Sequence, residues 1–114
     1  MNSRDKGARG ERELAQFLRD HGYNARRGQQ YSGANGDADV EGLSGIHIEC
    51  KRVEHLNIDE AMAQSERDSY ADSIKQGQRV IPTVFHRRNG KKWKVTMYAE
   101  DFLEMYSKGD NNER

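Results

Sequence analysis

Apolar residues recur at helical spacing in three segments of the chain. In residues 6–21, Leu14, Phe17 and Leu18 form the i, i+3, i+4 stripe of an amphipathic helix, and Gly22 provides its stop. Two further segments have helical features: residues 57–75, which begin at a cap residue and end before Gly77, and residues 100–107. The spacing therefore predicts three helices.

Between these segments the chain has the short runs that are typical of strands. Residues 46–51 alternate strictly between two faces. Ile46, Ile48 and Cys50 share one face, and His47, Glu49 and Lys51 share the other. The sequence predicts four further short strands, at residues 23–27, in a segment ending at residues 40–42, at residues 79–86 and at residues 92–98.

The order of these elements predicts the fold class. The segment Arg88-Asn89-Gly90 separates the last two strands as a hairpin turn. Pro82, inside the first of them, indicates an edge position or a bulge. The resulting order, α-β-β-β-α-β-β-α, predicts an α/β fold with a mixed central sheet flanked by helices.

Length and composition add the domain organisation. The chain has 114 residues, of which 33% are hydrophobic and 33% charged, and its mean hydropathy is -1.13. We expect one domain over residues 1–108 with a thin core, and a polar tail at residues 109–114. No apolar run approaches the ~18 residues of a membrane span, and no secretory signal is expected. A single cysteine, Cys50, favours a reducing compartment, so we expect a cytoplasmic protein of a bacterial, archaeal or phage-infected cell.

The charges are segregated, although the formal net charge is zero. Residues 1–30 carry 7 basic and 4 acidic residues, and residues 31–78 carry 4 basic and 10 acidic residues. Residues 79–96 carry 6 basic and no acidic residues, and residues 97–114 carry 2 basic and 5 acidic residues. A protein that contacts phosphates at its margins and holds a cation at an acidic centre would have this pattern, although solvated faces also produce charge runs.

The segment Glu49-Cys50-Lys51 carries the candidate chemistry. Its alternation places the carboxylate and the amine on one strand face. Asp39 lies ten residues upstream, and a turn at residues 43–45 would fold the two strands against each other. Two converging carboxylates favour a hard divalent cation such as Mg²⁺, and a neighbouring lysine suits phosphodiester hydrolysis. An acid-x-lysine strand by itself is more typical of a solvated face.

Other conspicuous residues have structural interpretations. His47 shares the face of Glu49, and we expect a half-exposed strand histidine there. Trp93 and Tyr98 are expected to fill the core. Cys50 points away from the acidic residues and is expected to be structural.

The chain resembles the PD-(D/E)XK nuclease superfamily, and within it the archaeal- and phage-type Holliday junction resolvases. The resemblance covers residues 6–106 and implies a restriction-endonuclease-like fold. Ala38 stands where the superfamily name expects proline, a position without a chemical role. The matching segments are Lys6-Gly7-Ala8-Arg9-Gly10-Glu11-Arg12-Glu13-Leu14, Asp39-Val40, Ile48-Glu49-Cys50-Lys51, His55-Leu56-Asn57-Ile58, Val84-Phe85 and Trp93.

The resemblance implies a role for each matching position. It implies five catalytic residues: Glu11, Asp39, Glu49, Lys51 and Gln64. Of these, Glu11, Asp39 and Glu49 would bind Mg²⁺, for which Mn²⁺ could substitute, together with the backbone carbonyl of Cys50. Lys51 would be the catalytic lysine.

Two choices among acidic residues can be argued physically. At about 100° per residue, Glu11 lies about 40–60° from the centre of the apolar stripe and Glu13 about 90°, so Glu11 is better directed at the sheet. Asp37 and Asp39 have the same strand parity, so periodicity does not separate them. We favour Asp39 because Val40 follows it directly.

The expected function is metal-dependent cleavage of DNA, with branched DNA such as a Holliday junction as substrate and a homodimer as the assembly. A flap, repair or restriction-type nuclease and a non-catalytic DNA-binding module of the same fold are the alternatives. DNA contacts are expected from two basic groups: Arg4, Lys6, Arg9 and Arg12 on one side, and Arg87, Arg88, Lys91 and Lys92 on the other.

Overall fold

The computed structural model describes residues 3–28 and 38–112, and the elements follow the predicted order α-β-β-β-α-β-β-α. Asp37 and the glycines at positions 33 and 36 lie outside the described residues. The elements are α1 (Ser3–Asp20), β1 (Arg26–Arg27), β2 (Val40–Glu41), β3 (Ile46–Arg52), α2 (Ile58–Gln76), β4 (Ile81–Arg87), β5 (Lys94–Thr96) and α3 (Ala99–Asn112).

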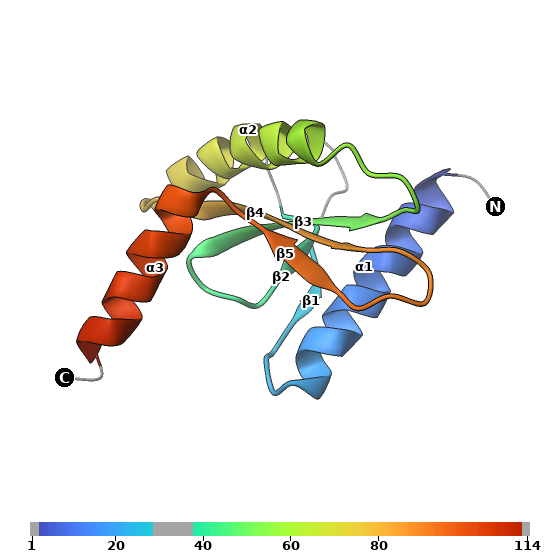
Figure 1. Ribbon diagram of the computed structural model, residues 1–114, viewed down its shortest axis with the longest axis horizontal. Coiled ribbons are helices and arrows are strands. Elements are labelled where there is room, and N and C mark those ends of the chain that lie inside the picture. Colours follow the sequence, from blue (N-terminus) through green and yellow to red (C-terminus); the bar gives the residue numbers. More distant parts are fainter. Residues whose placement is uncertain (1–2, 29–37, 113–114) are drawn as a thin grey trace.

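The strands form one mixed sheet in the order β1-β2-β3-β4-β5. The central pair, β3 and β4, is parallel, and α2 connects them, whereas the other neighbours are antiparallel. Helices α1 and α2 pack on opposite faces: Phe85 contacts the cluster under α1, and the adjacent Val84 contacts the cluster under α2. Figure 1 shows α3 extending away from the sheet. The predicted α/β fold with a mixed sheet between helices is confirmed.

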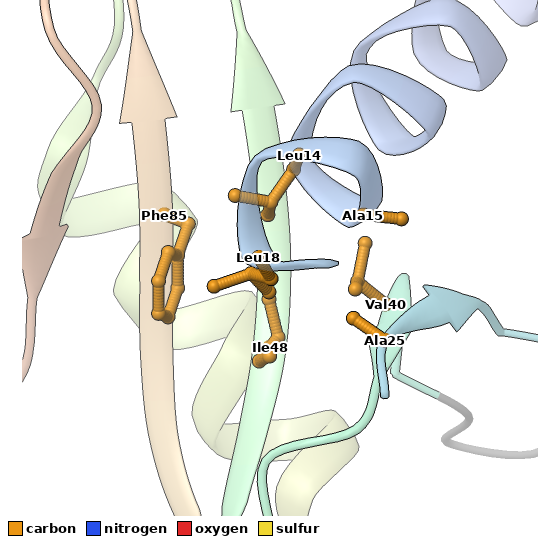
Figure 2. Packing of buried hydrophobic residues seen from close by; sticks show 7 residues of the cluster. All are labelled: Leu14, Ala15, Leu18, Ala25, Val40, Ile48 and Phe85. Atoms are coloured by element: carbon orange, nitrogen blue, oxygen red, sulfur yellow. The ribbon is translucent and has the colours of Figure 1, made fainter. Parts of the chain in front are cut away.

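The main core lies between α1 and the sheet. Leu14 and Leu18 of α1 pack against Val40, Ile48 and Phe85, as Figure 2 shows. The apolar stripe predicted for the first helix therefore packs on the apolar face predicted for β3. Phe17, which belongs to the stripe, is 36% exposed. A smaller cluster under α2 contains Ala61, Met62 and Val84.

The opposite face of β3 differs from the expectation. His47 is fully buried, with 0% of its surface exposed, so the prediction of a half-exposed histidine was wrong. The physical reason is that α2 covers this face of β3, and alternation does not reveal what covers a strand. Tyr98 is also not in the core, because it is 36% exposed, whereas Trp93 packs against the main cluster as expected.

The ends of the elements follow the predicted signals with one difference. Asn57 caps α2, its side chain accepting a hydrogen bond from the Glu60 amide at 3.1 Å, and Gly77 ends the helix in the left-handed region with φ 71°. Pro82 lies in the part of β4 that β5 does not pair with, since β5 pairs only with Val84 to His86. Helix α3 is longer than predicted and continues to Asn112. Among the described residues, no helix is both long and apolar enough to cross a membrane.

Candidate active site

Asp39 and Glu49 meet where β2 pairs with β3. The antiparallel register pairs Val40 with Ile48, the Asp39 amide donates to the Ile48 carbonyl at 2.9 Å, and a hydrogen bond links the carboxyl groups of Asp39 and Glu49. The Cys50 amide donates to Asp39 Oδ2 at 2.8 Å, which fixes this carboxylate beside β3. The structure thus brings together the two carboxylates singled out in the sequence.

Burial makes this pair electrostatically unfavourable without a cation. The Glu49 side chain is almost fully buried, and burial is the main cause that raises its pKa to about 8. The charge of Asp39 and a hydrogen bond between the two carboxyl groups raise this pKa further, and Asp68 adds a smaller repulsion. Lys51 acts in the opposite direction. Glu49 therefore holds a proton at neutral pH in the metal-free protein.

Lys51 and Gln64 lie beside Glu49 on the side that faces α2. Lys51 Nζ lies 3.8 Å from Glu49 Oε2 and donates to Gln64 Oε1 at 3.2 Å. Because Gln64 belongs to α2, the helix limits the positions that the lysine amine can take. The ammonium group is thus held between a carboxylate and an amide oxygen.

Glu11, on α1, lies near Asp39. The charge of Asp39 is the second cause, after burial, that raises the pKa of Glu11, and Arg27 Nε lies 3.1 Å from its carboxylate. Glu13 is directed elsewhere and pairs with Arg52 and Arg87. The structure therefore places Glu11 near Asp39, whereas Glu13 also reaches the sheet but at Arg52 and Arg87, so the helical angles alone do not distinguish the two residues.

Two glycines allow the backbone to approach closely around this centre. A Cβ atom at Gly10 would lie 2.7 Å from Arg52 Cβ, so α1 could not pack as closely on β3 with a larger residue. A Cβ atom at Gly28 would lie 1.8 Å from the Ala38 carbonyl oxygen, and the Gly28 amide donates to the Asp39 carbonyl at 2.9 Å. Gly28 thus lies directly against the backbone of Ala38 and Asp39 and fixes its position.

The sequence interpretation missed several residues of this site. Asp68 and Asp72 follow Gln64 at i+4 and i+8, so one face of α2 carries all three, and this spacing was a usable signal. A ligand atom of Asp68, one of His47 and one of Glu49 all lie within 4.8 Å of one another. The other missed residues are Arg27 and Arg52, which pair with acidic residues of α1.

The donor set suits a divalent cation. Carboxylate oxygens are the preferred ligands of hard divalent ions, and the hydrogen-bonded carboxyl groups of Asp39 and Glu49 supply them, with Glu11 near Asp39. The raised pKa of Glu49 is the expected signature of buried carboxylates that lack a counter-charge. A cation here would replace a proton, so the residues present fit a metal.

The raised pKa of Glu49 makes the stability of the metal-free protein depend on pH. Because the pKa of Glu49 rises from 4.5 to about 8 on folding, the folded state binds a proton that the unfolded chain releases over this range. The free energy of unfolding of the metal-free protein should therefore fall as pH rises from about 5 to about 8. Denaturant titrations of native protein and Glu49→Gln in EDTA check this. The variant should lose much less stability over the range, and parallel curves would contradict the assignment.

The predicted DNA-contacting residues lie at two neighbouring places. Arg9 and Arg12 are exposed on α1, while the side chains of Arg4 and Lys6 are outside the described residues. Glu13 of α1 pairs with Arg87 at the end of β4, so these two places adjoin. A groove of about 230 Å³ at this end of β4 is lined by an apolar and acidic group, Val53, Glu54, Leu56 and Ile58, and by a basic group formed with His86 by Arg87, Arg88, Lys91, Lys92 and Lys94.

A mixed sheet between helices, with an acidic residue facing a Glu-x-Lys segment on adjacent strands, defines a PD-(D/E)XK-type nuclease. A family model described as archaeal Holliday junction resolvase (Hjc) matches residues 2–109. The chain belongs to this family of nucleases, which resolve branched DNA. Both the predicted superfamily and the predicted group within it are thus confirmed.

One solved structure shows the same fold. The chain is similar to Archaeoglobus fulgidus Hjc, described as a Holliday junction resolvase from an archaeal hyperthermophile. The TM-score is 0.56 at 21% sequence identity, over 81% of this chain and 72% of that chain. No curated protein matches the sequence significantly.

Proposed function

We propose that the protein is a Mg²⁺-dependent endonuclease that cuts four-way DNA junctions. The observation that carries this proposal is the buried Asp39–Glu49 pair, with Lys51 held beside it by Gln64, in a member of the Hjc family. These groups match the requirements of phosphodiester hydrolysis, namely a cation site and a neighbouring positive charge.

The carboxylates of Asp39, Glu49 and Glu11, with the backbone carbonyl of Cys50, would hold the cation. A bound Mg²⁺ supplies Lewis acidity and neutralises charge that develops on the scissile phosphate. The protein contributes a fixed carboxylate, because the Cys50 amide donates a hydrogen bond to Asp39 Oδ2 and the Asp39 amide donates one to the Ile48 carbonyl. Glu49 must lose its proton for the cation to bind.

Lys51 has two tasks in this mechanism. Its ammonium group lies close enough to Glu49 to orient a water molecule at the scissile phosphate, and its charge opposes the negative charge that builds up there. A bond forms between the water oxygen and phosphorus, and the bond from phosphorus to one deoxyribose oxygen breaks. The water loses a proton, and the departing oxygen gains one. Gln64 fixes the amine through its amide oxygen.

A substrate panel tests the proposal. Labelled four-way junction, flap, duplex and single-stranded DNA are incubated with the protein in Mg²⁺, in Mn²⁺ and in EDTA. Paired cuts on the junction with either metal, and none in EDTA, are expected. Preferential cutting of flap or duplex would instead indicate a repair or restriction-type enzyme. Tight binding without any cutting would indicate a non-catalytic module.

We further propose that the protein acts as a homodimer. A four-way junction has near-twofold symmetry, so a C₂ dimer could present two sites to opposing strands. Large apolar side chains are exposed on α3, where Phe102, Leu103 and Tyr106 are 54%, 60% and 66% exposed, and the face they form suits a second copy.

The oligomeric state is directly measurable. Light scattering should give about twice the chain mass of 13.1 kDa, and Leu103→Glu should shift the protein toward the monomer. Lys108→Glu, a charge change on the same helix, serves as the control. A mass near one chain together with cutting of only one junction strand would reject both the dimer and paired resolution.

A further inference from the structure

His47 has an unusual environment for a strand histidine. Its side chain is completely buried between β3 and α2, and its Nδ1 atom lies 3.0 Å from Asp72 Oδ2. Its other ring nitrogen, Nε2, is the one buried side-chain nitrogen or oxygen among the described residues that has no hydrogen-bond partner. Buried polar atoms are almost always partnered, so this nitrogen requires an explanation.

The surroundings of the ring supply two carboxylates. A ring nitrogen of His47, a carboxylate oxygen of Glu49 and one of Asp68 all lie within 4.8 Å of one another. Glu49 follows His47 on the same face of β3, and Asp68 lies one helical turn before Asp72 on α2. One imidazole nitrogen and two carboxylate oxygens thus converge on one small volume.

The bond to Asp72 explains why Nε2 is available. A carboxylate only accepts hydrogen bonds, so in the tautomer that donates from Nδ1 to Asp72 the free electron pair of the ring lies on Nε2. A carboxylate that fixes the tautomer and orientation of a histidine is the common outer partner of a metal-bound imidazole. Gln76 in turn donates to Asp72 Oδ1 at 2.7 Å, which holds this carboxylate in place.

We propose that His47, Glu49 and Asp68 form a second divalent-cation site, with Asp72 as the residue that positions His47. This site lies on the α2 side of Glu49, whereas Asp39 approaches Glu49 from the start of β2 and has Glu11 of α1 as its other acidic neighbour. The two sites share Glu49 and have otherwise separate ligands. The inference concerns metal binding alone and does not depend on which DNA the protein cuts.

The ligands also indicate the kind of ion. An imidazole nitrogen suits first-row transition ions, whereas Mg²⁺ is bound almost entirely by oxygen. The second site should therefore prefer an ion such as Mn²⁺ over Mg²⁺. The first site, built from oxygen ligands, should accept both.

Mn²⁺ is a suitable probe because it can be counted and is visible by electron paramagnetic resonance. We expect two Mn²⁺ per chain by equilibrium dialysis, and a ¹⁴N coupling from directly bound imidazole in pulsed spectra. Excess Mg²⁺ should displace one of the two ions and leave the ¹⁴N coupling. One bound Mn²⁺ without ¹⁴N coupling would overturn the proposal.

Three variants locate the site. Asp68→Asn, which changes a partly exposed residue, should reduce binding to one Mn²⁺ and remove the ¹⁴N coupling. Asp72→Asn should keep the stoichiometry at high Mn²⁺ but weaken the second site about 10–100-fold. Glu66→Gln, an exposed charge change on the same helix, is the matched control and should bind two ions. If Asp68→Asn and Asp72→Asn both bind Mn²⁺ like native protein, the site does not exist, even if junction cutting is normal.

Discussion

Glu49→Gln and Asp39→Asn are each expected to lower junction cleavage by more than about 10³-fold while leaving the protein folded. Each change removes a carboxylate charge from the cation site. The fold should tolerate Glu49→Gln, because the raised pKa of Glu49 means that its carboxyl group is already uncharged at neutral pH without metal. Single-turnover cleavage of labelled junction, with circular dichroism of each variant, provides the measurement.

Lys51→Ala tests the other half of the mechanism. Because Lys51 would assist at the phosphate rather than hold the cation, its loss should cost about 10²–10⁴-fold in cleavage, with metal binding largely retained. Glu41→Gln is a matched control, since Glu41 lies two residues beyond Asp39 and pairs with Arg26.

Asp37→Ala should reduce cleavage much less than Asp39→Ala, and the opposite ranking would exchange the two assignments. Normal cleavage by Glu49→Gln would refute the site.

Binding of junction DNA should weaken steeply with salt. If six to ten phosphates are contacted, Kd should rise about 10³–10⁵-fold between about 50 and about 200 mM salt. The reason is release of counterions when exposed cations, such as those around the β4–β5 turn, meet the DNA backbone. Fluorescence anisotropy with a labelled junction and catalytically inactive Glu49→Gln measures this without cleavage.

Individual basic residues can then be ranked. Lys91→Ala and Lys92→Ala should each reduce the slope of log Kd against log salt by about 1. Lys108→Ala on α3, where the lysine pairs with Glu104, should leave the slope unchanged. A flat salt response of the native protein would exclude a phosphate-dominated interface.

The sequence predicted the fold and the acidic centre because both depend on local periodicity. Alternation in residues 46–51 placed Glu49 and Lys51 on one face, and a turn of few residues brought Asp39 to Glu49, since β2 pairs with β3 and the two carboxyl groups share a hydrogen bond. The helical angle favoured Glu11 over Glu13 for the sheet side, and the structure places Glu11 near Asp39 while Glu13 contacts Arg52 and Arg87 of the sheet. Each inference used residues that are close in the sequence.

The parts that could not be predicted depend on contacts between distant segments. Arg52 pairs with Glu13 across 39 residues, and Arg27 with Glu11 across 16. Periodicity assigns a side chain to a face, but the burial of His47 depends on α2 packing over that face. The spacing of Gln64, Asp68 and Asp72 places Asp68 on the same helix face as Gln64, but its proximity to Glu49 also requires that α2 packs over β3 with this face inward.

The contact between Gly28 and Ala38 has a consequence for how such a protein can diverge. The Gly28 amide donates to the Asp39 carbonyl, and a Cβ atom at position 28 would overlap the Ala38 carbonyl oxygen. Any larger residue at position 28 must therefore displace the backbone that carries Asp39, and with it the Asp39 carboxylate. A residue without a functional group thus constrains the evolution of the hydrolytic centre as strongly as a ligand does, and we expect a change at position 28 to be tolerated only together with a compensating change at position 38.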